Sequence, residues 1–189
     1  MLTVSPEIEL RNYREENAEE LFALIEANRP YLRPWLTWID RTQKVEHSLD
    51  FIHSGLQDQH DQKSLFLGIF KNEKLIGGIG MHDWNHTVRR AEIGYWLAKE
   101  ETGKGILHQC ATTFITFLFE KLQLNKITLH YFPANEKSAA VAKRLGFKVE
   151  GWLREQIVFN GQLQDIIVNG LLRKEWQQSI NNKDIIGVK

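Results

Sequence analysis

Two glycines, one residue apart, stand where an apolar strand pattern gives way to a helical pattern. The strand pattern covers Ala91–Ala98, and the segment that follows reads Lys99-Glu-Glu-Thr-Gly-Lys-Gly-Ile106. A helix start leaves about four backbone N–H groups unpaired and carries partial positive charge, and glycine lets such a backbone approach a phosphate closely. We therefore predict a pyrophosphate cradle, with an ordinary turn before a helix as the structural alternative. The cradle would consist of the backbone of Thr102, Gly103, Lys104, Gly105 and Ile106.

The same segment excludes two common nucleotide-binding motifs. Lys104 is followed by Gly105 and not by Ser or Thr, so the segment is not a Walker phosphate loop. It has no third glycine at the dinucleotide-binding spacing, and it does not follow an early first strand. The phosphate that this loop would bind therefore belongs to another class of cofactor.

A second group of polar residues opens a short helix further along the chain. This segment reads Asn135-Glu-Lys-Ser-Ala-Ala-Val-Ala-Lys-Arg-Leu-Gly-Phe147. Its apolar residues recur at helical spacing, and Gly146 suits a left-handed cap at the helix end. Asn135 and Ser138 each have an adequate structural interpretation, as the N-cap and as a first-turn hydroxyl. A chemical role for these two residues is indicated only when they are considered together with the glycine loop.

The elements that must position these two motifs alternate between the period of a strand and that of a helix. We predict that Pro30 and Pro34 interrupt the chain after the first helix. The order of elements predicts an α/β (α+β) fold, with a mixed, mostly antiparallel central sheet and helices on both faces. The predicted helices are Asn17–Asn28, Val45–Gln59, Thr102–Leu122 and Asn135–Leu145. The predicted strands are Glu7–Tyr13, Ser64–Lys71, Lys74–Met81, Arg89–Ala98, Lys126–Tyr131, Phe147–Glu150, Gln156–Asn160 and Gln164–Arg173.

Composition limits the classes of partner and the cellular compartment. Lys+Arg and Asp+Glu both number 24, so the net charge is zero, and we expect no direct nucleic-acid or membrane partner. The single cysteine, Cys110, excludes an internal disulfide, and the N-terminus lacks the apolar core of a signal peptide, so we expect a cytoplasmic protein. The 189 residues predict one domain, 1–189, with its core at about 7–174 and a polar tail at 181–189. A homodimer or a higher homo-oligomer is left open.

Together and in this order, the two motifs resemble those of the GNAT superfamily of N-acetyltransferases. That family has an Arg/Gln-x-x-Gly-x-Gly/Ala loop, followed one helix and one strand later by Asn-x-x-Ser/Ala and Gly-Phe. Gly103 and Gly105 match the loop, although Glu100 stands where Arg or Gln is usual, and Asn135 and Ser138 match the second motif. The resemblance covers about residues 7–174.

Shorter pieces are similar to the RimJ/RimL branch of that superfamily, whose best-known members acetylate the N-terminal α-amine of ribosomal proteins. These pieces are Leu32-Arg-Pro-Trp-Leu36, Glu92-Ile-Gly-Tyr-Trp-Leu97 and Gly146-Phe-x-x-Glu-Gly151. The resemblance implies an acetyl-CoA-dependent N-acetyltransferase whose acceptor is a protein N-terminus. A small-molecule amine, such as an amino acid, a polyamine or an antibiotic, is the alternative acceptor. A non-catalytic acetyl-CoA sensor is the alternative from another functional class.

The resemblance also implies how acetyl-CoA binds as a co-substrate. The strand backbone at Trp96, Leu97 and Ala98 would hold the pantetheine arm, and the side chain of Asn135 would contact it. A splay between this strand and Lys126–Tyr131 would admit the acetyl group. The N–H of Leu97 would stabilise the oxyanion that forms when an amine attacks the thioester.

The catalytic side chains depart from the usual family pattern. Many GNAT enzymes place a tyrosine acid seven residues after the motif asparagine, and here that position is Ala142. Ser138 is the candidate to orient or protonate the leaving thiolate. Glu92 is the candidate base, with an ion pair to Arg89 or Arg90 as its structural alternative. Glu150, Glu155 or a base that acts through water are further alternatives.

Aromatic residues provide candidate walls for the acceptor cleft, although aromatic side chains also build cores. The candidates are Tyr31, Trp35, Trp38 and Trp84. His82, Asp83 and His86 are spaced like metal ligands, but no further ligand cluster accompanies them, so we expect no metal. Cys110 lies on an apolar helical face, and we expect it to be a buried small hydrophobe.

Overall fold

The structure, a computed structural model, describes the backbone of residues 1–186 and the side chains of residues 1–180. Its strands form one sheet in the order β1-β2-β3-β4-β5-β6-β8-β7, in which only β5 and β6 are parallel neighbours. This confirms the predicted mixed, mostly antiparallel sheet. The strands are β1 Leu2–Ser5, β2 Ile8–Asn12, β3 Leu65–Lys71, β4 Lys74–Asn85, β5 Arg90–Leu97, β6 Lys126–Tyr131, β7 Lys148–Phe159 and β8 Gln162–Leu172.

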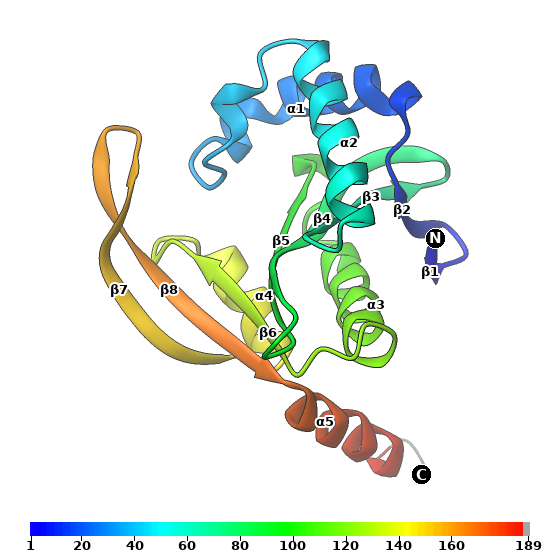
Figure 1. Ribbon diagram of the computed structural model, residues 1–189, viewed down its shortest axis with the longest axis vertical. Coiled ribbons are helices and arrows are strands. Elements are labelled where there is room, and N and C mark those ends of the chain that lie inside the picture. Colours follow the sequence, from blue (N-terminus) through cyan, green and yellow to red (C-terminus); the bar gives the residue numbers. More distant parts are fainter. Residues whose placement is uncertain (187–189) are drawn as a thin grey trace.

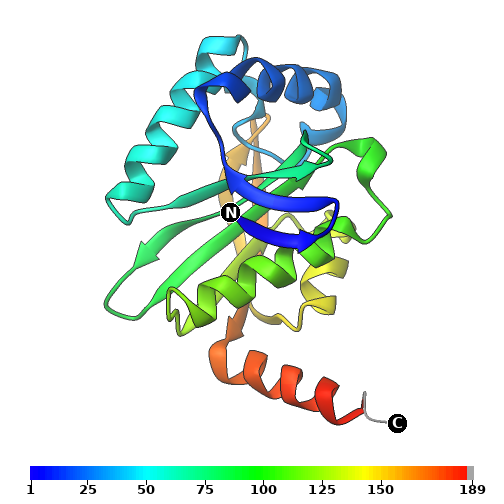
Figure 2. The same cartoon turned by 90° about the vertical axis from the view of Figure 1, so that its right-hand side faces the viewer.

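Helices lie on both faces of the sheet, with α1 and α2 above it and α3 and α4 below it (Figure 2). Two separate buried clusters fill these layers, one beneath α1 and α2 and one against α3 and α4. Strand β5 contributes to both because its side chains alternate: Ile93 and Leu97 belong to the α3 side, and Trp96 packs on the α1 side. The helices are α1 Ala18–Leu32, α2 Val45–His60, α3 Ile106–Glu120, α4 Glu136–Arg144 and α5 Arg173–Ile186.

The prediction that Pro30 ends the first helix is wrong. Helix α1 continues to Leu32 with Pro30 inside it, although proline cannot donate the backbone hydrogen bond of that turn. Leu32 is only 4 % exposed and joins Leu21 and Ile25 in the cluster beneath α1 and α2. Burial of this last apolar side chain offsets the lost bond. The sequence pattern shows the proline, but it does not show the surface against which Leu32 packs.

The predicted break between two closing strands is also wrong. Strand β7 runs without interruption from Lys148 to Phe159, with register shifts against β8 in place of a gap. Asp165 of β8 holds the second irregularity, because its carboxylate accepts hydrogen bonds from Trp152 Nε1 at 2.6 Å and from the N–H of Glu155 at 2.8 Å. Figure 1 shows the resulting long hairpin of β7 and β8 rising beside the rest of the molecule.

Both ends of the chain contain structure that the sequence patterns did not predict. Strand β1 pairs with β2 at the sheet edge. Helix α5 occupies the end of the chain, so the predicted polar tail at 181–189 begins inside a helix, and its residues 187–189 lie outside the described part. Trp176 of α5 is 7 % exposed and packs near Phe119 of α3, with 6.3 Å between ring centroids. This contact explains why a polar segment is helical here.

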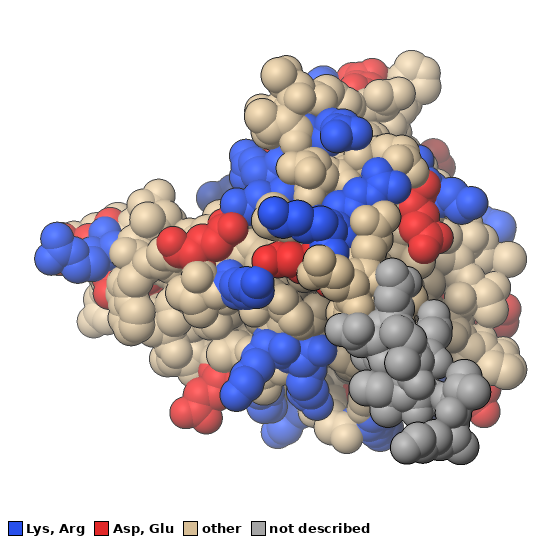
Figure 3. Space-filling model, turned by 90° about the horizontal axis from the view of Figure 1, so that it is seen from below, with Lys and Arg blue, Asp and Glu red and all other residues tan. Residues whose placement is uncertain are grey.

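Ion pairs link the strands at the lower end of the sheet to one another and to α5. Lys126 Nζ lies 2.6 Å from Glu150 Oε2, and Lys148 Nζ lies 2.6 Å from Glu175 Oε1. Seen from below, Lys and Arg side chains gather on this side of the molecule with Asp and Glu among them (Figure 3). None of the helices in the described part of the chain has the length and apolarity that a bilayer crossing requires.

Candidate active site

Strands β5 and β6 pair only over their first four residues. The parallel register runs from Arg90 opposite Lys126 to Ile93 opposite Leu129. Beyond that point β5 continues to pair with β4, and β6 continues to pair with β8. The two strands therefore diverge in the middle of the sheet (Figure 1), and we call the space beyond Ile93 and Leu129 the β5–β6 opening. This is the splay that the resemblance implied.

The backbone of β5 offers a hydrogen-bond donor to this opening. The N–H of Ala98 donates to Ile76 O of β4 at 2.8 Å. Successive N–H groups on an antiparallel strand point to opposite sides, so the N–H of Leu97 points away from β4. Leu97 lies opposite Gly77 on β4 and beyond the last β6 partner. Its amide is therefore free of ladder pairing on the side where a thioester could sit.

The loop that follows β5 holds both motif glycines in the left-handed region. Gly103 has φ +78° and Gly105 has φ +77°, conformations that an L-residue rarely adopts. A Cβ built on Gly103 would meet nothing within 4 Å, so open space lies in front of the loop. Helix α3 begins at Ile106 and not at Thr102, because these two glycines leave the helical region. The cradle is thus a loop that leads into a helix.

The N-terminus of α3 has no side-chain cap among the described residues. Gly105 is its N-cap, and no side chain in the described part of the chain caps it or places a carboxylate in the first turn. Unpaired N–H groups and the positive end of the helix dipole remain there. In the loop itself, Lys104 Nζ lies 3.1 Å from Glu101 Oε2, and Lys71 Nζ lies 3.3 Å from the same atom. Burial opposes ionisation of Glu101, but the two lysines outweigh it and lower the pKa of this carboxyl group.

Helix α4 starts beside the β5–β6 opening with the second motif. Asn135 Oδ1 accepts a hydrogen bond from the N–H of Ser138 at 3.1 Å, so Asn135 is the N-cap. This confirms the structural interpretation of Asn135 and leaves its cofactor role a prediction. Lys137 Nζ lies 4.9 Å from the ring centroid of Tyr31, which joins the start of α4 to the end of α1.

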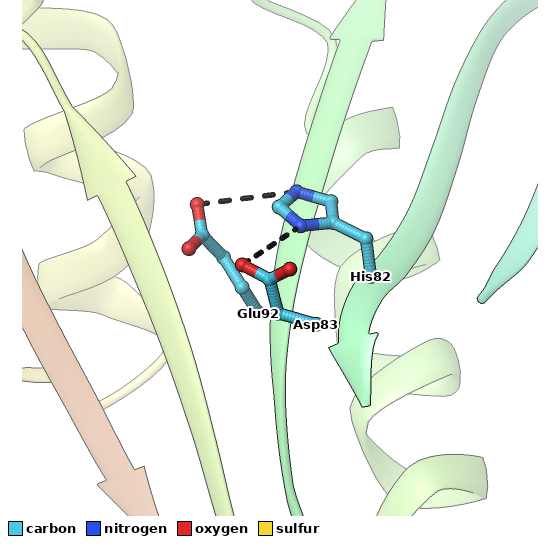
Figure 4. A group of neighbouring side chains, drawn as sticks. All are labelled: His82, Asp83 and Glu92. Atoms are coloured by element: carbon cyan, nitrogen blue, oxygen red, sulfur yellow. Dashed lines mark ion pairs between the residues drawn. The ribbon is translucent and has the colours of Figure 1, made fainter. Parts of the chain in front are cut away.

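Glu92 lies between two histidines, on the sheet face covered by α1 and α2. Its Oε2 is 2.9 Å from His130 Nδ1, and its Oε1 is 3.9 Å from His82 Nε2. Figure 4 shows the carboxylates of Glu92 and Asp83 turned toward the two nitrogens of the His82 ring. Ligand atoms of these three residues lie within 4.8 Å of one another, and their ion pairs account for this proximity. The partners of Glu92 are thus imidazoles and not the arginines considered from the sequence.

Sequence reasoning missed His130 and Tyr95. His130 follows Thr128 at strand spacing on β6, and Thr128 is the register partner of Glu92, so period-two alternation was the available signal. Tyr95 of β5 faces the α3 side, and its hydroxyl is buried without a hydrogen-bond partner. Burial raises the pKa of Tyr95 to about 12, and the nearby Ser138 hydroxyl opposes that rise. An aromatic residue on a strand is usually interpreted as part of the core, so the sequence pattern gives no sign of a buried hydroxyl with a separate role.

The four aromatic candidates for the acceptor cleft do not lie together. Trp38 packs edge-on against Trp96 at 6.2 Å between centroids, and Tyr31 lies on the same side, in the cluster beneath α1 and α2. Trp35 is half-buried in the connection after α1. Trp84 is not part of this wall: it stacks on His86 at 4.7 Å and packs against the cluster on the α3 side.

A hollow of about 550 Å³ separates the end of α1 from the turn of the β7–β8 hairpin. Pro30, Arg33 and Pro34 line it on one side, and Asn160 lines it on the other.

Cys110 takes no part in any of these features. It is fully buried, and burial raises the pKa of its thiol to about 12, which confirms the prediction of a buried hydrophobe and argues against a thiolate nucleophile.

Comparison with known proteins decides the family. A profile described as the acetyltransferase (GNAT) domain matches residues 7–148. The chain belongs to the GNAT acetyltransferase family. YdaF of Bacillus subtilis, a candidate ribosomal N-acetyltransferase, is 34% identical over 175 residues, 92% of this chain and 96% of the relative. The ribosomal-protein-serine acetyltransferase of Escherichia coli is 29% identical over 166 residues, 87% of this acetyltransferase and 92% of the relative.

A solved structure adds the cofactor. The microcin C7 self-immunity acetyltransferase MccE, in complex with acetyl-CoA and AMP, is 28% identical with a TM-score of 0.86, over 89% of this acetyltransferase and 94% of that chain. This acetyltransferase is an acyltransferase with acetyl-CoA as its co-substrate. The resemblance to the RimJ/RimL branch is confirmed by the relatives named for ribosomal-protein acetylation.

Proposed function

We propose that this acetyltransferase transfers the acetyl group of acetyl-CoA to the N-terminal α-amine of a protein, and that the protein is a ribosomal one. Relatives that match over nearly their whole length carry ribosomal-protein acetyltransferase names. Such an acceptor places the enzyme in the cytoplasm, where ribosomes are made. We propose that residues 1–189 act as one domain and contact the acceptor polypeptide without direct contact to nucleic acid.

The β5–β6 opening and the glycine loop would hold the cofactor. The strand backbone at Trp96–Ala98 would bind the pantetheine arm, as an added strand binds a sheet edge, because β6 has diverged there. The N–H groups of Thr102–Ile106 would hold the pyrophosphate in the open space before Gly103. Lys104 and Asn135 would assist with charge and with an amide.

The chemistry follows from groups on the two faces of the opening. The amine nitrogen attacks the thioester carbon, and the N–H of Leu97 would stabilise the oxyanion that forms. Glu92 would take the proton that the attacking nitrogen loses, with His130 holding its carboxylate at 2.9 Å. When the C–S bond breaks, its electron pair goes to sulfur, and the Ser138 hydroxyl would donate a hydrogen bond to that thiolate.

The single observation that carries the choice of a polypeptide acceptor is the 550 Å³ hollow between the end of α1 and the hairpin turn. The end of α1 and the hairpin turn face each other across it, and a chain that continues beyond its reacting amine would need such an exit. Pro30, Arg33 and Pro34 line it on the α1 side, and the aromatic side chains of Tyr31, Trp35 and Trp38 from the same segment would also contact the acceptor. An α-amine also suits a weakly activated site, because its pKa of about 7.7–8.0 leaves more of it neutral than the pKa of about 10.4 of lysine does.

A thiol-release assay with acetyl-CoA tests the acceptor. We expect turnover with short peptides that copy ribosomal-protein N-termini, and none with the same peptides after their α-amine has been blocked. Mass spectrometry of the product should place the acetyl group on the N-terminus and not on a lysine side chain. Turnover with polyamines or amino acids but not with peptides would replace this acceptor by a small amine. Tight acetyl-CoA binding without turnover on any amine would replace the enzyme by a sensor.

A further inference from the structure

Tyr95 places a phenol under the β5–β6 opening, on the face opposite Glu92. It alternates with Gly94 and Trp96 along β5 and packs with the cluster on the α3 side. Its register partner on β4 is Ile79, and it lies two residues beyond the last β6 partner of β5. The ring therefore lies beside the space where β5 and β6 separate, on the side that α4 covers.

The hydroxyl of Tyr95 has no bond that explains its burial. Its oxygen is shielded from solvent, and no group in the described part of the chain makes a hydrogen bond to it within 3.5 Å. A buried hydroxyl without a partner lowers stability, whereas phenylalanine would fill the same space at no such cost. Among the neighbouring side chains, the Ser138 hydroxyl lowers the pKa of Tyr95 most, through hydrogen bonding, although burial outweighs it. Ser138 is therefore the side chain that would serve as the partner of this phenol.

The backbone of Ser138 is fixed while its hydroxyl is half-buried. Its N–H is held by Asn135 Oδ1 at 3.1 Å, at the first turn of α4. A serine hydroxyl has one hydrogen to donate and two lone pairs to accept with. If one lone pair of Ser138 Oγ accepts a hydrogen bond from the Tyr95 side, the Ser138 hydrogen is directed away from Tyr95 and toward the β5–β6 opening.

We propose that Tyr95 is a positioning residue for departure of the thiolate: when acetyl-CoA is bound, its O–H donates to Ser138 Oγ and so directs the Ser138 O–H at the sulfur of acetyl-CoA. This rests on the role of Ser138 in the proposed function. The N–C bond forms, the C–S bond breaks with its electron pair on sulfur, and the proton of the amine goes to Glu92. Donation by Tyr95 strengthens the next hydrogen bond in the chain. No proton leaves Tyr95, because a phenol with a pKa near 12 stays protonated beside a thiolate.

The Tyr95→Phe variant tests this in the full-length enzyme. We expect kcat to fall about tenfold, the effect of one ordinary hydrogen bond, with the KM for acetyl-CoA within about twofold of wild type. The melting temperature without acetyl-CoA should not fall, because in that state the buried hydroxyl has no partner to lose. Tyr131→Phe is the matched control, since this neighbouring phenol on β6 bonds to Asn169 Oδ1 at 3.5 Å instead. Its kcat should stay at the wild-type value.

A double mutant and an altered phenol separate positioning from a merely structural effect. Tyr95→Phe combined with Ser138→Ala should be no slower than Ser138→Ala alone, because Tyr95 acts through that hydroxyl. A fluorinated tyrosine at position 95, with a more acidic phenol, should bring an alkaline loss of kcat into the measurable pH range. Unchanged kcat in Tyr95→Phe, or losses that multiply in the double mutant, would overturn the proposal.

Failure of the proposed acceptor is distinguishable from failure of this inference. The variants are compared with whichever amine the wild-type enzyme acetylates, and release of thiol to water serves if it acetylates none. A wild type that ignores peptides refutes the acceptor alone. A Tyr95→Phe variant that matches wild type in the same assay refutes the role of Tyr95 alone.

Discussion

Replacing Gly103 by valine tests the phosphate loop most directly. Gly103 has φ +78°, where an L-residue costs about 1–2 kcal/mol and a β-branched one is a clear outlier. Gly161 is a matched control in the β7–β8 turn, with φ +74° and likewise nothing within 4 Å of an added Cβ. Both valine variants should lose a similar amount of stability, with melting temperatures lower by roughly 2–8 °C.

Only the Gly103→Val variant should lose affinity for coenzyme A. Its side chain would enter the open space before the loop, where the pyrophosphate would accept hydrogen bonds from backbone N–H groups. Loss of one such charge-assisted bond costs about 1.5–3 kcal/mol, or roughly 10–150-fold in Kd. Gly161→Val lies in a different turn and should bind coenzyme A as wild type does.

Calorimetric titration of the folded variants with coenzyme A measures this difference. Titration with acetyl-pantetheine, which lacks the pyrophosphate, provides the second comparison. We expect the penalty of Gly103→Val to disappear with that ligand, because no phosphate then has to approach the loop. A folded Gly103→Val variant whose Kd for coenzyme A stays within about threefold of Gly161→Val would refute the assignment of the loop.

Three further predictions concern the base, the helix cap and the acid limit of stability. Glu92→Gln should lower kcat by about 10²–10⁴-fold with little change in the KM for acetyl-CoA, as steady-state kinetics would show. Asn135→Ala should cost about 1 kcal/mol of stability in denaturant unfolding, because it removes the N-cap of α4. Hydrogen bonds from Lys148 Nζ and from the N–H of Leu172 lower the pKa of Glu175. The stabilisation from the Glu175 carboxylate is therefore present above about pH 4.3 and is lost as pH falls through the lower pKa of the folded state. Glu175→Gln should lower the melting temperature at pH 7 by up to roughly 4 °C, and it should change the melting temperature less near pH 3.

Features that depend on a few neighbouring residues were predictable from the sequence. The glycines at 103 and 105, the capped start of α4 and the alternation along β5 are local, because backbone conformation and side-chain direction follow from spacing of a few residues. The order of strands and helices was predictable for the same reason. The errors at Pro30 and in the middle of β7 arose where packing or a bulge held by Asp165 overrode local preference.

The sequence by itself therefore determined the family, the glycine loop before α3 and the place of Glu92 and Ser138 within their elements. Only the tertiary structure decided which side chains meet. Glu92 and His130 come from strands whose pairing ends at the next residue pair, yet their side chains lie 2.9 Å apart. Contacts of this kind depend on where β5 and β6 separate, and that point is set by packing on both faces of the sheet and not by any local pattern of residues.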